Sequence, residues 1–399
     1  MKKLTIDKQN SIIEQAIKEN KKLSAILSES DLTYDDLMYS NDSIDVSSAT
    51  FAPIDLMDNL PISSDAIPAV SFFSGAGGLD IGFKSAGFNN IIAIEHTELF
   101  CNTLRHNNPK QIVLGPPYCT GDVSNREEIS DLLLKHGVNE YFNGVFHGGP
   151  PCQSFSIAAN QRFNKDGEHF KRTGFEDEEK GMLIFDYIWY IKKFKPLAFL
   201  IENVAGILEC DPDGKISKAL QELKNIGYTI PEPQVLDAAY YGVPQHRRRW
   251  IVLGIRGNST IEYPSPDNSV TPCGYVFTRP LANVKNHITR QHNAESIMRY
   301  CKLKIGERDK LGRVDRLNPY EPSKTVIAGG VKGGGRSHLH PFIPRTISVR
   351  ECARLQTFPD SYEFTGTYAR QFTQVGNAVP PMLAYKIALQ IKKAIQSLK

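Results

Sequence analysis

The stretch AVSFFSGAGGLDIGF, residues 69–83, decides the fold. A short apolar run at 69–73 enters a glycine-rich turn at 74–78, and the residues after the turn open a helix. This order is typical of the first strand-turn-helix unit of a nucleotide-binding parallel sheet, in which glycines let the backbone approach a ligand. Asp80 stands where the third glycine of a Gly-x-Gly-x-x-Gly motif would be, so a pyrophosphate site is not indicated. The sequence predicts an α/β fold with a ligand beside this turn.

Carboxylates follow further apolar runs. Residues 91–94 lead into Glu95, residues 197–201 lead into Glu202, and Asp122 lies near another expected strand end. Parallel strands end at one edge of the sheet, where ligands bind. Glu95 is placed to bind ribose hydroxyls, and Asp122 suits an adenine amino group. Each acid taken alone is equally well a surface, capping or turn residue, and for Asp122 alone a cap is the commoner role.

Cys152 stands in the motif Gly149-Pro150-Pro151-Cys152-Gln153, directly after the apolar run 144–146. Two prolines fix φ and remove two backbone donors, so the thiol that follows is held in one direction. A cysteine held in this way at a strand end is suited to nucleophilic attack. The alternative is a buried cysteine that acts as a small apolar residue.

Composition indicates an ordinary globular protein. The chain has 399 residues, a net charge of +3, 41% hydrophobic and 23% charged residues. Its seven cysteines show no C-x-x-C spacing, which disfavours a disulfide framework and a zinc site, so we expect a reducing compartment and no metal. The first residues lack the apolar core of a signal peptide, and no run is long enough to span a bilayer. We therefore expect a cytoplasmic protein without membrane contact.

Charge divides the chain unevenly. Residues 1–66 hold 6 Lys/Arg against 12 Asp/Glu, whereas residues 256–344 hold 14 against 7. The basic segment predicts a surface for a polyanion, although surplus basic residues are often only a solvated face. The acidic segment has helical periodicity before a polar linker at 40–50. A helix-turn-helix is one alternative there, but its acidity favours a small extension that packs on the protein or on a partner.

Five motifs stand in a specific order along the chain. They are Ser74-Gly75-Ala76-Gly77-Gly78, Gly149-Pro150-Pro151-Cys152-Gln153, Glu202-Asn203-Val204, Gln245-His246-Arg247-Arg248-Arg249 and Gln374-Val375-Gly376-Asn377-Ala378-Val379-Pro380. From about residue 68 to the C-terminus the chain resembles the C5-cytosine-specific DNA methyltransferases of bacterial restriction-modification systems. Each motif alone is only suggestive, but the five in order are specific.

The resemblance implies the chemistry. Cys152 would add to C6 of a cytosine flipped out of duplex DNA, and Glu202 would contact N3 and the amino group of that base. Arg247 and Arg249 match the Gln-x-Arg-x-Arg pattern and would hold the base and the catalytic residues. Alternatively, these two arginines would contact DNA phosphates or solvent. Ser71 departs from the family pattern, in which an aspartate is frequent at this position.

The resemblance also implies S-adenosylmethionine as cofactor. The residues expected to line its pocket are Phe73, Gly75, Gly78, Glu95, Asp122, Pro151, Leu183, Asn377 and Ala378. The expected fold is a Rossmann-like S-adenosylmethionine-dependent methyltransferase sheet with a smaller inserted target-recognition domain. Residues 67–255 would form the catalytic and cofactor-binding domain, 256–344 the target-recognition domain, and 345–399 a return to the cofactor pocket ending in a helix from about residue 381. Residues 1–66 would be a mostly helical extension.

Double-stranded DNA is the expected substrate, contacted by Gln153, Thr325 and Arg336, with residues 158–180 as a mobile lid. We further expect a monomer that works beside a cognate restriction endonuclease on the same site, without a stable complex. The sequence does not disclose the recognition site.

Three alternatives stay open. An amino-group methyltransferase is suggested by Gly115-Pro116-Pro117-Tyr118, but the required acid or amide is absent and we expect no strand end there. A cytosine-5 methyltransferase acting on tRNA shares the expected fold, although the Cys-Phe-Thr signature of that branch is absent. The third alternative, a catalytically silent DNA-binding regulator, is disfavoured by the intact Cys152 and Glu202.

Overall fold

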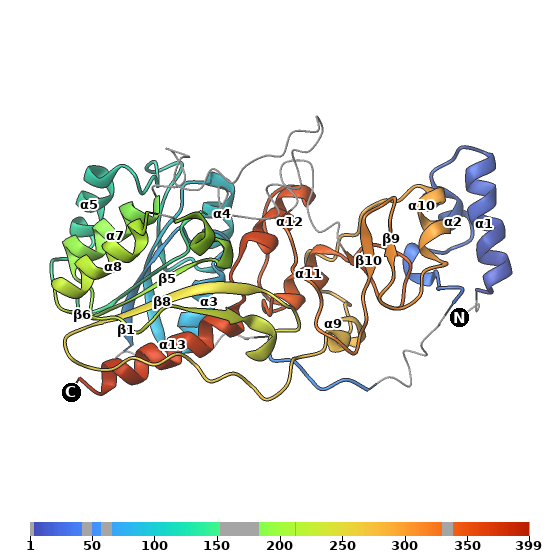
Figure 1. The fold of residues 1–399 in the computed structure, drawn as a ribbon. Coiled ribbons are helices and arrows are strands. Elements are labelled where there is room, and N and C mark those ends of the chain that lie inside the picture. Colours follow the sequence, from blue (N-terminus) through green and yellow to red (C-terminus); the bar gives the residue numbers. More distant parts are fainter. Residues whose placement is uncertain are drawn as a thin grey trace.

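The computed structural model describes residues 4–41, 50–56, 66–151, 183–211, 213–328 and 338–398. Two lobes lie side by side, a large sheet covered by helices and a smaller lobe that includes the N-terminal helices (Figure 1). None of the described helices combines the length and apolar composition needed to cross a bilayer.

The large sheet has the order β3-β2-β1-β4-β5-β8-β6, with β7 also paired to β8. Its strands are β1 (Ile67–Phe72), β2 (Phe88–Ile94), β3 (Ile112–Leu114), β4 (Val145–Gly148), β5 (Ala198–Val204), β6 (Tyr228–Thr229), β7 (Gln234–Asp237) and β8 (Arg248–Arg256). Strands β1 to β5 are parallel and β8 is antiparallel to β5. The strand order reverses between β1 and β4, which is where open α/β sheets form a ligand crevice. The predicted α/β fold is confirmed.

Helices cover both faces of this sheet (Figure 1). One face packs on α5 (Arg126–Lys135), α7 (Leu183–Phe194) and α8 (Lys215–Asn225). The other packs on α3 (Gly78–Ser85), α4 (Glu98–Asn107) and α13 (Pro381–Gln396). The strands are apolar on both sides, as a doubly covered parallel sheet requires.

The last helix lies directly on the first helix of the sheet. A Cβ added at Gly82 of α3 would lie 2.4 Å from Ala384 Cβ and 2.6 Å from Pro381 O of α13. Only glycine permits this approach, since real Cβ contacts are longer. Two helices that are about 300 residues apart in the sequence therefore form one side of the same lobe.

The smaller lobe contains the sheet β11-β10-β9 and short helices. Its elements are α9 (Gly274–Thr278), α10 (Ala294–Tyr300), β9 (Arg308–Asp309), β10 (Val314–Arg316), β11 (His338–Leu339), α11 (Val349–Leu355) and α12 (Tyr368–Asn377). The N-terminal α1 (Ile6–Lys18), α2 (Leu23–Glu29) and the 3₁₀ turn η1 (Tyr34–Asp36) lie against it. Two further 3₁₀ turns, η3 (Ala205–Cys210) and η4 (Ala238–Tyr240), flank β5 and β8. The N-terminal helices pack on the rest of the protein, as expected of a small packing extension.

Strand boundaries differ slightly from those expected. The first strand ends at Phe72, and Phe73 has a left-handed φ of 52°. Glu202 lies inside β5, opposite Ile251 of β8, rather than just beyond the strand. Gly115 does follow a strand end, because β3 stops at Leu114; the expectation that no strand ends there was wrong. A strand of three residues is too short for a recognisable pattern.

Candidate active site

Four of the predicted site residues lie at the carboxyl edge of the large sheet. Phe73 follows β1, Glu95 follows β2, Pro151 lies three residues past β4, and Glu202 is in β5. These strands are parallel neighbours around the reversal point, so their ends face one crevice. Cys152, Gln153, Arg336 and the predicted lid at 158–180 lie outside the described residues.

Glu202 forms a buried ion pair with Arg249. Arg249 Nε lies 2.7 Å from Glu202 Oε1, and the two side chains are 12% and 9% exposed. They are diagonal neighbours on the same face of the β5–β8 pair, because Glu202 faces Ile251 and Arg249 faces Val204. Burial raises the pKa of Glu202, and the positive charges of Arg249 and Arg247 partly oppose this rise. The site thus favours a carboxyl group that keeps a proton to higher pH than usual.

The absence of a side chain at Gly149 leaves room for the Glu202 carboxylate. A Cβ at Gly149 would lie 2.6 Å from Glu202 Oε2. The neighbouring strand end is tied in as well, since Asn203 Nδ2 donates to Pro150 O at 3.4 Å. The segment that leads to Cys152 therefore passes directly over Glu202.

Arg247 differs from Arg249 in what it contacts. Its guanidinium is 1% exposed and donates to Val326 O at 3.1 Å and to Gly376 O at 2.9 Å. It thereby joins the start of β8 to the segment 323–328 and to the end of α12. These contacts fit the predicted role of holding other parts of the site.

The glycine turn is closed by Glu95. Gly75 N donates to Glu95 Oε2 at 2.8 Å, and Thr97 N donates to Glu95 Oε1 at 2.7 Å. Burial raises the pKa of this carboxyl group, and the two backbone donors oppose the rise. Among the described residues, a Cβ at Gly75 would meet only Phe73 O, at 3.9 Å, so none of them fills the space beside this glycine. This leaves room for a ligand at the end of β1.

Residues 377–379 reach the same turn from the far end of the sequence. A Cβ at Gly78 would lie 2.1 Å from Val379 O and 3.4 Å from Ala378 Cβ. Ala378 is buried, while Asn377 at the end of α12 is exposed. Two segments that the sequence predicted to share a pocket are thus in contact.

Ser71, which departs from the family pattern, has a defined role. Ser71 Oγ donates to Asp80 Oδ2 at 2.9 Å, and Ser74 Oγ lies 2.9 Å from Ser71 Oγ. Gln111 Nε2 donates to Asp80 Oδ1 at 2.9 Å. Burial raises the pKa of Asp80 to about 6 against these hydrogen bonds. The carboxylate expected on β1 is therefore supplied from the first turn of α3.

The remaining predicted residues are more peripheral. Asp122 Oδ1 accepts from Ser124 N and Oγ, which is the geometry of a turn aspartate. Leu183 is the partly buried first residue of α7. Thr325 Oγ1 donates to His246 O at 2.6 Å, beside the arginine motif. Their binding roles stay predictions.

Two glutamines were not predicted as site residues. Gln245 Nε2 donates to Gln356 Oε1 at 2.9 Å, and Gln245 Oε1 accepts from Val326 N at 2.8 Å. Gln356 Nε2 in turn donates to Val375 O and Ala378 O. Gln245 opens the quoted arginine motif, so its place in that motif was the available signal. The pair connects the catalytic edge with the C-terminal segment.

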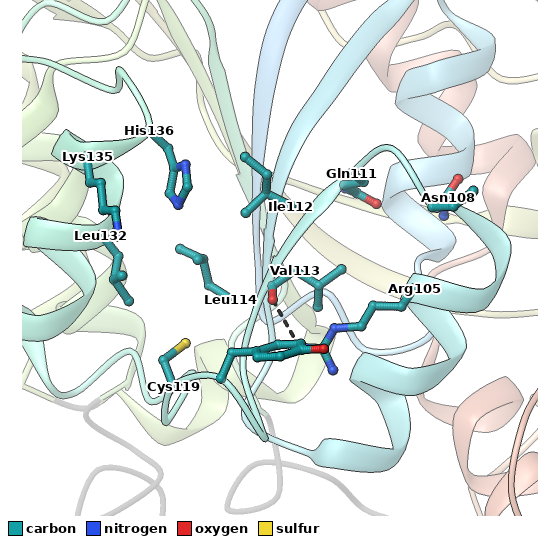
Figure 2. A pocket seen from close by; sticks show the side chains of 12 residues that line it. Arg105, Asn108, Gln111, Ile112, Val113, Leu114, Cys119, Leu132, Lys135 and His136 are labelled. Atoms are coloured by element: carbon teal, nitrogen blue, oxygen red, sulfur yellow. Dashed lines mark hydrogen bonds between the residues drawn. The ribbon is translucent and has the colours of Figure 1, made fainter.

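A cavity of about 570 Å³ lies elsewhere, outside the edge strand β3 and between α4 and α5 (Figure 2). Its lining includes Arg105, Tyr118, Lys135 and His136, and none of the predicted site residues. The Gly115 motif borders this cavity and is held structurally: Arg105 donates to Pro116 O and Gly115 O. We place the active site at the strand ends, where the polar groups converge, and not here.

Comparison with known proteins agrees with this geometry. A family model described as C-5 cytosine-specific DNA methylase matches residues 67–298 and 274–393. The chain belongs to this family. Type II methyltransferase M.PspPI of Psychrobacter sp. (strain TA137) is 32% identical over 355 residues, covering 82% of this chain and 78% of that protein. M.MthTI of Methanothermobacter thermautotrophicus is 33% identical over 353 residues, covering 82% and 97%.

Solved structures show the same fold. A DNA modification methyltransferase encoded within an E. coli prophage aligns with a TM-score of 0.64 and 25% identity, over 83% of this chain and all of that one. The S. pombe Dnmt2 methyltransferase aligns with a TM-score of 0.57 and 16% identity, over 84% of this chain and 99% of that one, which bears on the fold alone. The resemblance inferred from the five motifs is confirmed.

Proposed function

We infer that this methylase transfers a methyl group from S-adenosylmethionine to C5 of a cytosine in duplex DNA. The observation that carries the inference is the buried Glu202–Arg249 pair directly beneath the segment 149–151 that leads to Cys152. A buried carboxyl group with a raised pKa, next to the segment that leads to a cysteine, is what addition of a thiolate to a pyrimidine ring needs.

The chain's own residues supply the following steps. The Cys152 thiolate forms a bond to C6, and the ring electrons move toward C5 as Glu202 delivers its proton to N3. C5 then takes the methyl group, a water molecule accepts the proton from C5, and the C6–S bond breaks to release the thiolate. N3 returns its proton to Glu202, which restores both the aromatic ring and the carboxyl group. Arg249 holds the Glu202 carboxyl in place throughout. S-adenosylmethionine, when bound, supplies an electrophilic methyl on a sulfonium.

The residues at the end of β1 fit this cofactor. Glu95 is a buried carboxylate suited to ribose hydroxyls, and none of the described residues fills the space beside Gly75. Phe73, Gly78, Pro151, Leu183, Asn377 and Ala378 would form the walls, with Asp122 toward the adenine. No phosphate-binding spacing is needed for a ligand of this kind.

Residues 256–344 would contact the DNA. The turn between β9 and β10 presents Leu311, which is 76% exposed, between Lys310 and Arg313. Asp309 fixes this turn by accepting from Gly312 N and pairing with Arg299. A rigid apolar tip between two cations suits a groove of the duplex. Thr325, Arg336 and Gln153 would add further contacts.

The biological setting proposed is restriction-modification. Both curated relatives named above are type II methyltransferases. We expect the enzyme to act as a monomer and to protect sites that a cognate endonuclease cuts, without a stable complex between the two.

The test is tritium transfer from labelled S-adenosylmethionine to duplex DNA and, in parallel, to tRNA. Wild type should label C5 of cytosine in DNA, whereas Cys152→Ala and Glu202→Gln should lose more than about 10²-fold. Matched controls are Cys119→Ala, a free partly buried thiol, and Glu98→Gln, an exposed acid. Labelling of tRNA instead of DNA, or full activity of Cys152→Ala, would overturn the proposal. Bisulfite sequencing of DNA from expressing cells then gives the site.

A further inference from the structure

Residues 4–41 share a hydrophobic core with the proposed recognition domain, at the end of the molecule away from the large sheet (Figure 1). Nine of the sixteen buried residues in this core come from the N-terminal segment. Examples are Ile13 and Leu27 against Ile297, Val314 and Leu339. The recognition segment supplies less than half of its own core here, so this part of the lobe is not complete without residues 4–41.

Specific polar contacts fix the same interface. Tyr39, 1% exposed, donates its hydroxyl to His340 O at 2.8 Å, and the Arg316 guanidinium lies 3.6 Å from its ring centroid. Arg316 also donates to Asn41 O and Leu303 O. A buried cation over an aromatic ring with carbonyl partners defines one orientation, whereas apolar packing alone tolerates several.

One ion pair extends from this interface to α11. Arg345, 1% exposed, donates from Nε to Asp35 Oδ1 at 2.5 Å and from both terminal nitrogens to Glu351, each at 2.9 Å. Glu351 lies in the first turn of α11 and also accepts from Ser348 N. Asp35 is thus connected to the start of α11 through the Arg345 guanidinium. His287 adds a second connection, since its Nε2 lies 3.8 Å from Asp35 Oδ2 and its Nδ1 lies 3.0 Å from the hydroxyl of Ser348, the N-cap of α11.

Helix α11 leads on to the active site. It ends at Leu355, and the next residue, Gln356, bonds to Gln245 of the arginine motif and to Ala378 O beside the glycine turn. The N-terminal segment therefore connects, through the contacts of Asp35 and the short helix α11, to the residues that hold both proposed pockets.

We propose that residues 4–41 complete the DNA-recognition domain and that Asp35 is a positioning residue, which sets that domain on α11 through Arg345. This inference rests on the proposed function, because it takes 256–344 as the DNA-binding segment. Residues 1–66 lie outside the family match, so the family's fold does not account for this element. Asp35 acts on DNA affinity and on discrimination between sites, and not on the chemistry at Cys152.

The test is Asp35→Asn in the full-length protein. The side chain of Asp35 is 49% exposed, and Arg345 keeps Glu351 as a partner, so the variant leaves no unpaired buried charge and should fold. Asp31→Asn, an exposed acid of the same segment, is the matched control, and Asp35→Glu tests rescue. Kinetics are measured on a duplex carrying the mapped site and on one with a single mismatch.

Asp35→Asn should raise KM for the duplex about ten-fold, the worth of one charge-assisted hydrogen bond, and reduce the preference over the mismatched duplex. Its kcat and KM for S-adenosylmethionine should stay within about two-fold of wild type, and Asp35→Glu should recover most of the loss. If Asp35→Asn fails to fold, Tyr39→Phe, which loses only the bond to His340, should show the same split on a smaller scale.

Two outcomes would overturn the inference. One is an unchanged KM for the duplex in Asp35→Asn, and the other is a fall in kcat with KM unchanged, which would indicate a general stability role. A wild type that methylates no duplex would instead refute the proposed function itself, so the two failures are distinguishable.

Discussion

Replacing Gly149 by alanine tests the placement of Glu202 while both proposed catalytic residues, Cys152 and Glu202, keep their own side chains. Gly149 has no left-handed φ, so alanine is allowed by the backbone and the effect is purely steric. The new Cβ would lie 2.6 Å from Glu202 Oε2, whereas an ordinary contact begins at 3.4 Å. The carboxylate must therefore move by about 0.8 Å relative to Arg249 or to the bound base, since a Cβ cannot overlap it.

A displacement of this size should lower kcat about 50-fold, which corresponds to a rise of about 2.3 kcal/mol in the activation free energy. The magnitude follows because misplacing a catalytic group by 1 Å lowers the rate roughly 10²-fold. The assay is methyl transfer to duplex DNA at saturating substrates, with the melting temperature measured in parallel. In a Glu202→Gln background the same alanine should cost little, because the group that it displaces has already lost its proton-donating role.

Gly148→Ala is the matched control. Its Cβ would lie 3.0 Å from Phe72 O and 3.2 Å from Tyr187 Cε1, so it crowds the core and not the carboxylate. We expect a lower melting temperature with kcat within about three-fold of wild type. A wild-type kcat for Gly149→Ala, or an equal loss in both variants, would refute the placement of Glu202 described above.

Three further predictions concern other parts of the molecule. Because burial raises the pKa of Asp80 from 3.8 to about 6, the folded protein keeps a proton that the unfolded chain loses, and the free energy of unfolding falls as pH rises between these values. Asp80→Asn should remove that fall, which amounts to about 3 kcal/mol between low and neutral pH, as measured by urea unfolding of both proteins across this range. Leu311→Ala should weaken duplex binding about ten-fold at constant kcat, in contrast to Leu134→Ala on α5; equal binding by both would contradict a DNA contact. Gly78→Ala, whose Cβ would lie 2.1 Å from Val379 O, should weaken S-adenosylmethionine binding more than duplex binding in calorimetric titrations.

The sequence predicted the catalytic lobe well because its signals are local. Apolar runs ending at Glu95 and near Glu202 place these residues on one sheet edge once the strands are parallel. The difference between Arg247 and Arg249 was not predictable. It depends on the register of β5 and β8, which puts Arg249 beside Glu202, and no single strand carries that information.

The packing partner of the N-terminal segment could not be predicted from the sequence either. Its helical period is evident from Ile12, Ile13 and Ala16, but periodicity says only that one face is buried and not against what. The partner, α10, lies far along the chain and is itself too short for a strong pattern. The ion pair of Asp35 with Arg345 is likewise invisible in sequence, since it joins two residues with no motif around them.

The contact between Gly78 and Val379 has a consequence for synthesis of the protein. The turn after the first strand rests on Val379, which the ribosome adds long after the strands of the sheet, so the proposed cofactor pocket stays open until α13 has emerged and folded back. A nascent or prematurely terminated chain can build the central strands early, yet it has no wall behind the glycine turn. Methylation activity should therefore appear only after α13 has been synthesised, at a delay set by translation and not by folding of the sheet.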